Sequence, residues 1–179
     1  ALTLFYMGYK EDRHRRRNLL LFYGALGFAV LSKGPVGLAL PAMIIGLYLI
    51  VEKNLKFIMK MQIGWGILIF LGIASPWYVL ISLKNPEYAA YFFIKQNLGN
   101  FLSAETRHPG PFYYYIPVLF GGFFPWSCFL PLAVIYAFRR RFTTVHNGVF
   151  FIIIWFSIVF IFFSAATSKL ATYILPLFP

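Results

Sequence analysis

Long apolar runs separated by short polar segments make up most of the chain. The four longest runs cover residues 18–50, 62–83, 112–138 and 149–166. A helix needs about 20 residues, at ~1.5 Å per residue, to cross the ~30 Å hydrocarbon core of a bilayer. The pattern therefore predicts an all-α, polytopic transmembrane protein.

The first run is too long for a single crossing. Its roughly 33 residues would form a helix of roughly 50 Å, well beyond the ~30 Å core. The run is interrupted by Ser32-Lys33-Gly34-Pro35, and proline disfavours helical backbone in the residue before it. We therefore expect two spans joined by a turn at Lys33. Together with the tail of a span at residues 1–9, the chain should contain about five to six spans.

Three polar segments are rich in lysine and arginine, at residues 10–18, 52–60 and 139–141. Cytoplasmic loops of membrane proteins carry such an excess of positive charge. Two spans in the first apolar run put the first two segments on the same side, whereas one span would separate them. We therefore assign all three basic segments to the cytoplasm.

The polar sites between these segments then reach the non-cytoplasmic face, which is the periplasm in a bacterium. They are Lys33, an outer loop at residues 84–111, and Ser168-Lys169. Within the outer loop, residues 88–103 place most apolar side chains in one helical sector and amides in the opposite one. This pattern predicts an outer interfacial helix.

Composition agrees with a membrane protein and argues against several functions. Hydrophobic residues make up 60% of the chain, compared with roughly 45–50% in soluble domains. The net charge of +11 comes from short clusters, so positive-inside topology explains it and we expect no nucleic-acid partner. Cys128 is the only cysteine, which excludes an internal disulfide and a cysteine-based zinc site. The sequence contains neither a phosphate-binding Gly-rich loop nor an H-E-x-x-H motif.

The ends of the sequence lie within apolar runs. The first residue is Ala1 rather than methionine, and the last residues, YILPLFP, begin another run. We therefore expect residues 1–179 to be an internal part of one longer transmembrane domain. Elements needed for function would then lie outside this segment.

Two isolated lysines stand at breaks between apolar runs. Lys33 precedes Gly34-Pro35, and Lys169 lies one helical turn before Tyr173. A lysine at the membrane surface supplies a point charge that can hold a phosphate. Alternatively, each side chain simply extends to the interface so that its ammonium stays hydrated. The pattern alone leaves both interpretations open.

The outer loop contains the remaining candidates for chemistry. His108 follows Arg107 in a polar turn and could bind a metal or a phosphate, or transfer a proton, because imidazole titrates near neutral pH. Glu87 and Glu105 could act as a base or as metal ligands. Solvated loop side chains without such a role are the alternative for all of them.

Four short motifs occur in a defined order: LSKGPVGLALP at 31–41, SPWY at 75–78, HPGPFYYYIPVLFGGFFPWS at 108–127, and SKLATYILPLFP at 168–179. In this order and spacing they resemble the bacterial membrane glycosyltransferases of the aminoarabinose transferase type. Those enzymes belong to the protein-mannosyltransferase-like superfamily, which has the GT-C fold. The resemblance covers the chain from about Asn18 onward.

The resemblance implies an enzyme that takes a sugar from a polyprenyl-phosphate donor. The sugar would pass, with inversion, to an acceptor on the outer face, which could be lipid A, another glycan or a protein. In this family the catalytic aspartate lies in the first large outer loop. The only aspartate here is Asp12, which lies in a basic cytoplasmic segment. We therefore expect the catalytic base upstream of Ala1.

The resemblance also implies which residues bind the carrier phosphate. Lys169 and Tyr173 correspond to a lysine and a tyrosine near that phosphate. Lys33 and Arg107 would supply further cations, which stabilise the charge that develops as the bond between sugar and phosphate breaks.

Two further expectations follow from the family. His108 corresponds to a histidine that contributes to a metal site beside the carrier, which allows a divalent metal as a cofactor. The aromatic residues Tyr113, Tyr114 and Tyr115 would line a groove for the prenyl chain or the sugar.

Two other functions fit the same outer cations. A transporter or flippase would move lipid-linked sugars without chemistry, although the spans lack the charged mid-span residues of an ion or proton pathway. A non-catalytic membrane subunit would tolerate the loss of the outer cations. An outer loop with an aspartate upstream of Ala1 would favour the enzyme.

Overall fold

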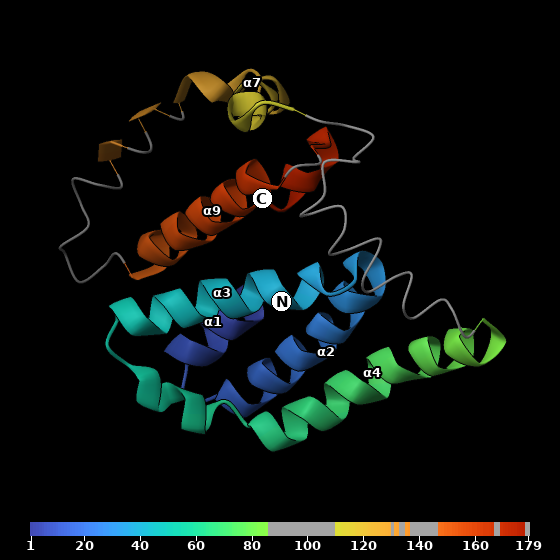
Figure 1. Cartoon of the computed structure of the whole chain (residues 1–179). Helices are drawn as coiled ribbons and strands as arrows, with labels where there is room; N and C mark the ends of the chain where they lie inside the picture. Colours follow the sequence, from blue (N-terminus) through green and yellow to red (C-terminus); the bar gives the residue numbers. More distant parts are fainter. Residues whose placement is uncertain (86–109, 130, 133–134, 137–146, 167–168, 178–179) are drawn as a thin grey trace. The chain divides into compact units, whose positions relative to one another are not determined.

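The computed structural model describes residues 1–85, 110–129, 131–132, 135–136, 147–166 and 169–177. The chain divides into two units, residues 1–98 and 99–179, and each is described by itself (Figure 1). Every regular element of the described residues is a helix. The predicted all-α fold class is confirmed.

The described residues of unit 1 form four α-helices and one short 3-10 helix. They are α1 (Leu2–Lys10), α2 (Arg15–Lys33), α3 (Val36–Val51), η1 (Leu55–Lys60) and α4 (Ile63–Lys84). Helix α2 packs against α1, α3 and α4, so it forms the centre of the unit. Its buried apolar face includes Leu19, Phe22 and Leu26.

A glycine turn separates α2 from α3, as the sequence predicts. Gly34 has a φ of 66°, a left-handed conformation that glycine adopts at little cost. Its N–H donates to the carbonyl of Val30 over 2.8 Å, and α3 starts directly after Pro35. A Cβ added to Gly37 would lie 2.5 Å from the carbonyl oxygen of Ala29. The two helices therefore approach closely because residue 37 has no side chain.

Helices α2 and α4 run in the same direction. Gly66, near the start of α4, lies against the ring of Tyr23 on α2. Further along both helices, the hydroxyl of Tyr78 donates to the carbonyl of Val30 over 3.0 Å. Because residue numbers rise together along the interface, α2 and α4 both start at one end of the unit, and α3, which connects them in the sequence, runs back in the opposite direction. The two elements predicted on either side of Lys33 are confirmed as helices.

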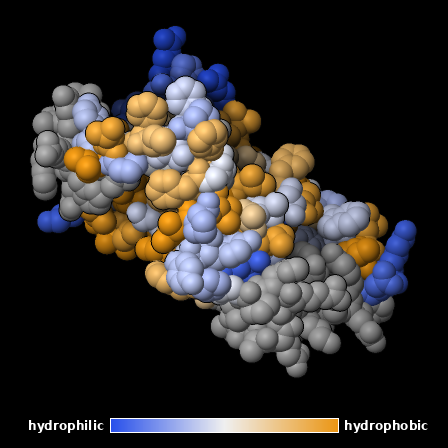
Figure 2. Space-filling model, turned by 90° about the horizontal axis from the view of Figure 1, so that it is seen from above, coloured by the Kyte–Doolittle hydropathy of each residue, from blue (hydrophilic) through white to orange (hydrophobic). Residues whose placement is uncertain are grey.

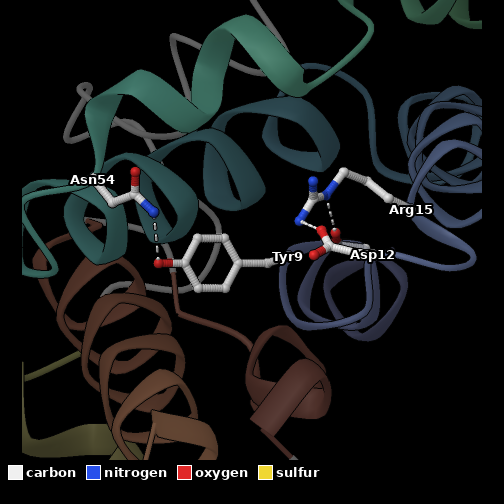
Figure 3. A network of polar contacts seen from close by, with 5 residues as sticks. Tyr9, Asp12, Arg15 and Asn54 are labelled. Carbon is white, nitrogen blue, oxygen red and sulfur yellow. Dashed lines mark hydrogen bonds and ion pairs between the residues drawn. The ribbon is translucent and has the colours of Figure 1, made fainter.

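The first two basic segments lie at the same end of unit 1. The side-chain amide of Asn54 donates to the hydroxyl of Tyr9 over 3.1 Å (Figure 3). The guanidinium of Arg15 lies 5.4 Å from the centroid of the Phe57 ring. Each contact joins the segment at residues 10–18, or Tyr9 directly before it, to the segment at residues 52–60. The two segments therefore lie at the same end of the unit, which agrees with their predicted placement on one side of the membrane.

Unit 2 is built around α9 and the segment that follows it. The elements of its described residues are η3 (Phe112–Tyr114), α7 (Tyr115–Gly122), η4 (Trp126–Phe129), α9 (Asn147–Ala165) and η6 (Ala171–Leu177). The 3-10 helix η6 packs against both α7 and α9. The side chains of Tyr115, Val159 and Ile174 are almost fully buried at the centre of this unit.

The predicted return span at residues 112–138 is not one continuous helix. Helix α7 ends at Gly122, a turn covers residues 123–125, and η4 begins at Trp126. Glycine has a low helix propensity, and proline cannot donate the backbone hydrogen bond that a helix interior requires. Gly121-Gly122 followed by Pro125 therefore interrupts the run.

Two helices of the described residues are long and apolar enough to cross a membrane, Ile63–Lys84 and Gly148–Ala165. Helix Val36–Val51 is apolar but shorter. Large apolar side chains remain exposed on α4, including Trp65, Leu68 and Leu71, and apolar residues cover much of the visible surface of the described chain (Figure 2). A bilayer accounts for such exposure better than water does.

Candidate active site

Lys33 is the last residue of α2 and is exposed. A cation in this position interacts favourably with the negative end of the helix dipole. Lys33 lies at the end of unit 1 opposite to the basic segments, since α2 is 19 residues long, or about 28 Å. Its predicted location away from the basic segments is therefore confirmed within unit 1.

Lys169 is buried, with only 5% of its surface exposed. Its ammonium donates to the carbonyls of Ser164 over 2.7 Å and of Ala166 over 2.8 Å. These carbonyls lie at the C-terminal end of α9, where backbone acceptors have no partner within the helix. Burial lowers the pKa of Lys169, because desolvation disfavours the charged amine.

The ammonium of Lys169 still has capacity to bind an anion. An ammonium carries three N–H groups, and two are used by the carbonyls of α9. Within the part of the chain that the structure describes, no third acceptor is bound to it. The third N–H is therefore the group through which the ammonium would contact an anion.

Tyr115 packs against Lys169 and bonds to the residue that follows it. Its ring is fully buried, and the ammonium of Lys169 lies 5.8 Å from the ring centroid, within the distance of a cation–π interaction. The backbone N–H of Leu170 donates to the Tyr115 hydroxyl over 3.3 Å. Tyr115 therefore holds the segment that follows α9 instead of lining an open groove.

The other two tyrosines of the aromatic motif are more accessible. Tyr113 is exposed and Tyr114 is half-buried, with its ring packed 5.2 Å from that of Tyr115. Of the three predicted groove residues, Tyr113 and Tyr114 are thus the ones whose rings can contact a ligand within unit 2.

Gly110 is a residue that sequence reasoning missed. A Cβ added at this position would lie 3.1 Å from Cδ of Lys169 and 3.3 Å from its Cγ. The chain therefore passes directly along the lysine stem because residue 110 has no side chain. Its neighbour Lys169 lies 59 residues away in the chain, so the contact is not evident from the sequence.

Tyr173 belongs to the same short segment as Lys169. It is half-buried in η6, its N–H donates to the carbonyl of Leu170 over 2.9 Å, and its ring lies 5.4 Å from that of Phe163 on α9. The structure thus brings together Gly110, Tyr115 and Lys169, with Tyr173 one turn further along the segment.

Several predicted site residues lie outside the described residues. They are the interfacial helix at 88–103 and the side chains Glu87, Glu105, Arg107 and His108. Among the residues that are described, no group of three or more histidine, cysteine, aspartate or glutamate side chains could hold a metal ion. The described residues around Lys169 supply carbonyls that are already bonded to its ammonium, and these do not by themselves form a metal site.

Curated relatives cover almost the whole chain. The undecaprenyl phosphate-alpha-4-amino-4-deoxy-L-arabinose arabinosyl transferase of Photorhabdus laumondii is 34% identical over 178 residues, which is 98% of this chain and 32% of the relative. The enzyme of the same name from Aeromonas hydrophila is 33% identical over 180 residues, covering 99% and 32% of the two chains. The chain is a relative of the aminoarabinose transferases. It spans about a third of the length of the curated relatives it matches.

Solved aminoarabinose transferase structures have the same fold over this segment. The crystal structure of ArnT from Cupriavidus metallidurans bound to undecaprenyl phosphate matches with a TM-score of 0.87 at 32% identity. The match covers 98% of this chain and 32% of that one. The apo structure of the same transferase matches with a TM-score of 0.83. No family model matches the chain.

The predicted resemblance to the aminoarabinose transferases is therefore confirmed. The chain is a helical membrane protein, which agrees with its two long apolar helices and its exposed apolar surface.

Proposed function

We propose that the chain forms part of a glycosyltransferase that moves a sugar from a polyprenyl-phosphate carrier to an acceptor on the non-cytoplasmic face of the membrane. The observation that carries this proposal is the match, over 98% of the chain, to a transferase crystallised with undecaprenyl phosphate. The names of the relatives favour undecaprenyl phosphate-linked aminoarabinose as the donor. Lipid A, another glycan or a protein is the acceptor.

Lys169 is the residue that we propose for holding the carrier phosphate. Its ammonium is oriented by two carbonyls and an aromatic ring before any ligand binds. A cation held in this way stabilises the developing phosphate charge without reorganising during the reaction. Its burial strengthens the attraction, because the local dielectric constant is lower than that of water.

Other side chains complete the proposed phosphate site. Tyr173 lies on the same segment and can donate its hydroxyl to a phosphate oxygen, while Lys33 and Arg107 supply further positive charge. Tyr113 and Tyr114 would contact the prenyl chain or the sugar. Tyr115 positions Lys169 through its ring, over which the ammonium lies.

The catalytic base is expected outside this segment. In unit 1, Glu11 and Asp12 precede α2 and Glu52 follows α3, so all three lie with the basic segments, opposite Lys33. A base must come within hydrogen-bond reach of the acceptor hydroxyl on the non-cytoplasmic face, and these carboxylates lie among the basic segments that we assign to the cytoplasm. We therefore keep the base upstream of Ala1, with inversion at the anomeric carbon.

We also propose the topology that this site requires. The parallel direction of α2 and α4 supports two crossings before α4, with the basic segments in the cytoplasm. The full count remains five to six spans in this segment, with the interfacial helix at 88–103 on the outer side. His108 remains the proposed metal ligand, together with a partner outside the segment.

A transfer assay with the full-length parent protein tests the proposed function. The protein is reconstituted in vesicles with radiolabelled undecaprenyl phosphate-linked aminoarabinose and lipid A. We expect label to move to lipid A, with release of undecaprenyl phosphate. Movement of intact donor across the bilayer without release would contradict the transferase and support the flippase. If the protein neither transfers the sugar nor moves the donor, the result would support a non-catalytic subunit.

A further inference from the structure

The 3-10 helix η1 exposes apolar and cationic side chains together. Phe57 is its buried residue, 4% exposed, and its ring lies 4.8 Å from that of Tyr9 and 6.1 Å from that of Phe5. On the outside, Met59 is 88% exposed. Lys56 and Lys60 flank it and are also exposed. Phe57 therefore anchors η1, and the remaining surface of this helix is both apolar and positively charged.

The first basic segment is fixed beside this element. Arg15 is held in place because it pairs with Asp12 (Figure 3), donates to the carbonyl of Gly8 over 3.2 Å and lies over the Phe57 ring. Its charge is therefore already engaged inside the unit. Besides Lys10, six cations of the two segments remain exposed around it, and they are Arg13, Arg16, Arg17, Lys53, Lys56 and Lys60. We call these six residues the basic-loop surface.

The charge of this region is strongly positive. Residues 10–17 and 52–60 contain eight lysine and arginine residues and three acidic residues, which gives a net charge of 8 − 3 = +5. Helix α4 starts three residues after Lys60 and exposes Trp65 in its first turn. Tryptophan is typical of the boundary between headgroups and hydrocarbon.

We propose that the basic-loop surface binds anionic phospholipid headgroups of the leaflet beside it. Basic residues next to a membrane are attracted by an anionic leaflet, and exposed apolar side chains such as Met59 and Leu55 insert at the boundary between headgroups and acyl chains. A soluble anion would satisfy the charge but would leave these apolar side chains in water. The proposal does not depend on the catalytic proposal, since it concerns the end of unit 1 opposite Lys33.

The test uses the full-length parent protein in a neutral detergent. Binding of phosphatidylglycerol and of phosphatidylcholine is measured by native mass spectrometry for wild type and for the triple variant Lys53→Gln, Lys56→Gln and Lys60→Gln. We expect wild type to bind phosphatidylglycerol at least about tenfold more tightly than phosphatidylcholine, and the triple variant to lose most of that preference. The corresponding triple arginine variant should retain it, because it keeps the charge.

Two controls separate this surface from general attraction. Lys84→Gln removes an exposed lysine at the opposite end of α4 and should leave the preference unchanged. Glycerol phosphate, which has a similar headgroup but no acyl chains, should compete poorly. Equal binding of the two lipids, an equal loss in Lys84→Gln, or full competition by glycerol phosphate would each overturn the proposal.

Discussion

The side chain of Lys169 is surrounded by groups from three parts of the sequence. The carbonyls at the end of α9 are three and five residues away, while Tyr115 and Gly110 are more than 50 residues away. The local contacts cap a helix, and the distant ones fix where that cap lies. The distant residues, Tyr115 and Gly110, can each be substituted alone to test this role.

Replacing Tyr115 with phenylalanine should loosen the segment that carries Lys169. The ring would stay, but the acceptor for the Leu170 N–H would be lost, at a cost of about 1 kcal/mol in stability. We expect a lower melting temperature in detergent and a several-fold fall in transfer. Tyr113→Phe changes an exposed hydroxyl and should not alter the melting temperature. Equal melting temperatures for wild type and Tyr115→Phe would contradict the supporting role.

Gly110→Ala should displace Lys169 with little other change. The new methyl group would lie 3.1–3.3 Å from three carbons of the lysine stem, so the stem has to move by a few tenths of an ångström. A small misplacement at a reacting centre has a large effect on rate, and we expect transfer to fall about tenfold or more.

Gly121→Ala is the matched control for that change. Nothing in the described structure lies within 4 Å of a Cβ at this position in α7, and alanine is the better helix former by roughly 0.5–1 kcal/mol. Its transfer should equal that of wild type. If both glycine variants lose activity to the same degree, the contact between Gly110 and Lys169 is not the cause.

At the scale of elements, unit 1 depends on how closely α3 approaches α2. Two glycines of α3 differ sharply in surroundings: a Cβ at Gly37 would meet the backbone of Ala29, whereas one at Gly46 would meet nothing within 4 Å. Backbone cannot rotate away as a side chain can, so the two positions should respond differently to the same substitution.

Gly37→Ala should therefore destabilise the protein by about 1–3 kcal/mol, as overpacking does. Gly46→Ala should have no destabilising effect, because it fills open space and favours the helix. Thermal unfolding of the two variants in one detergent gives the comparison. A melting temperature for Gly37→Ala at or above that of Gly46→Ala would contradict the close packing of α2 and α3.

The elements predicted best from the sequence are those defined by local signals. The break at Gly34-Pro35 and the helices α4 and α9 follow from glycine, proline and long apolar runs. The interruption after Gly122 was missed because the apolar pattern continues through it. The burial of Lys169 was also missed, since a lysine at an apolar boundary looks the same in the sequence whether it faces water or a tyrosine ring.

At the scale of the whole molecule, the resemblance to the aminoarabinose transferases was evident from four motifs, while the arrangement around Lys169 was not. The motifs are read from chain order and spacing, so no structure is needed to find them. The contacts of Gly110 and Tyr115 with the segment after α9 depend on tertiary packing. The site residues outside the described part of the chain, including His108, stay predictions.

The topology of the whole molecule is tested by cysteine labelling. In a cysteine-free background of the full-length protein, Lys33→Cys should react with a membrane-impermeant maleimide added to intact bacterial cells with a permeabilised outer membrane. Lys56→Cys should react only after the inner membrane is opened, because α2 separates the two ends of unit 1 by about 28 Å. Labelling of both from the same side would contradict the assigned membrane sides.

The measurement that tests the central claim most directly is binding of undecaprenyl phosphate to the full-length protein with Lys169→Met. Methionine retains an unbranched apolar stem against Tyr115 but removes the charge, and unfolding curves show whether the variant folds. Since a hydrogen bond to a charged group contributes about 1.5–3 kcal/mol, we predict binding roughly tenfold to a hundredfold weaker than wild type, with Lys84→Met unchanged. A folded Lys169→Met variant that binds the carrier as tightly as wild type would contradict the account.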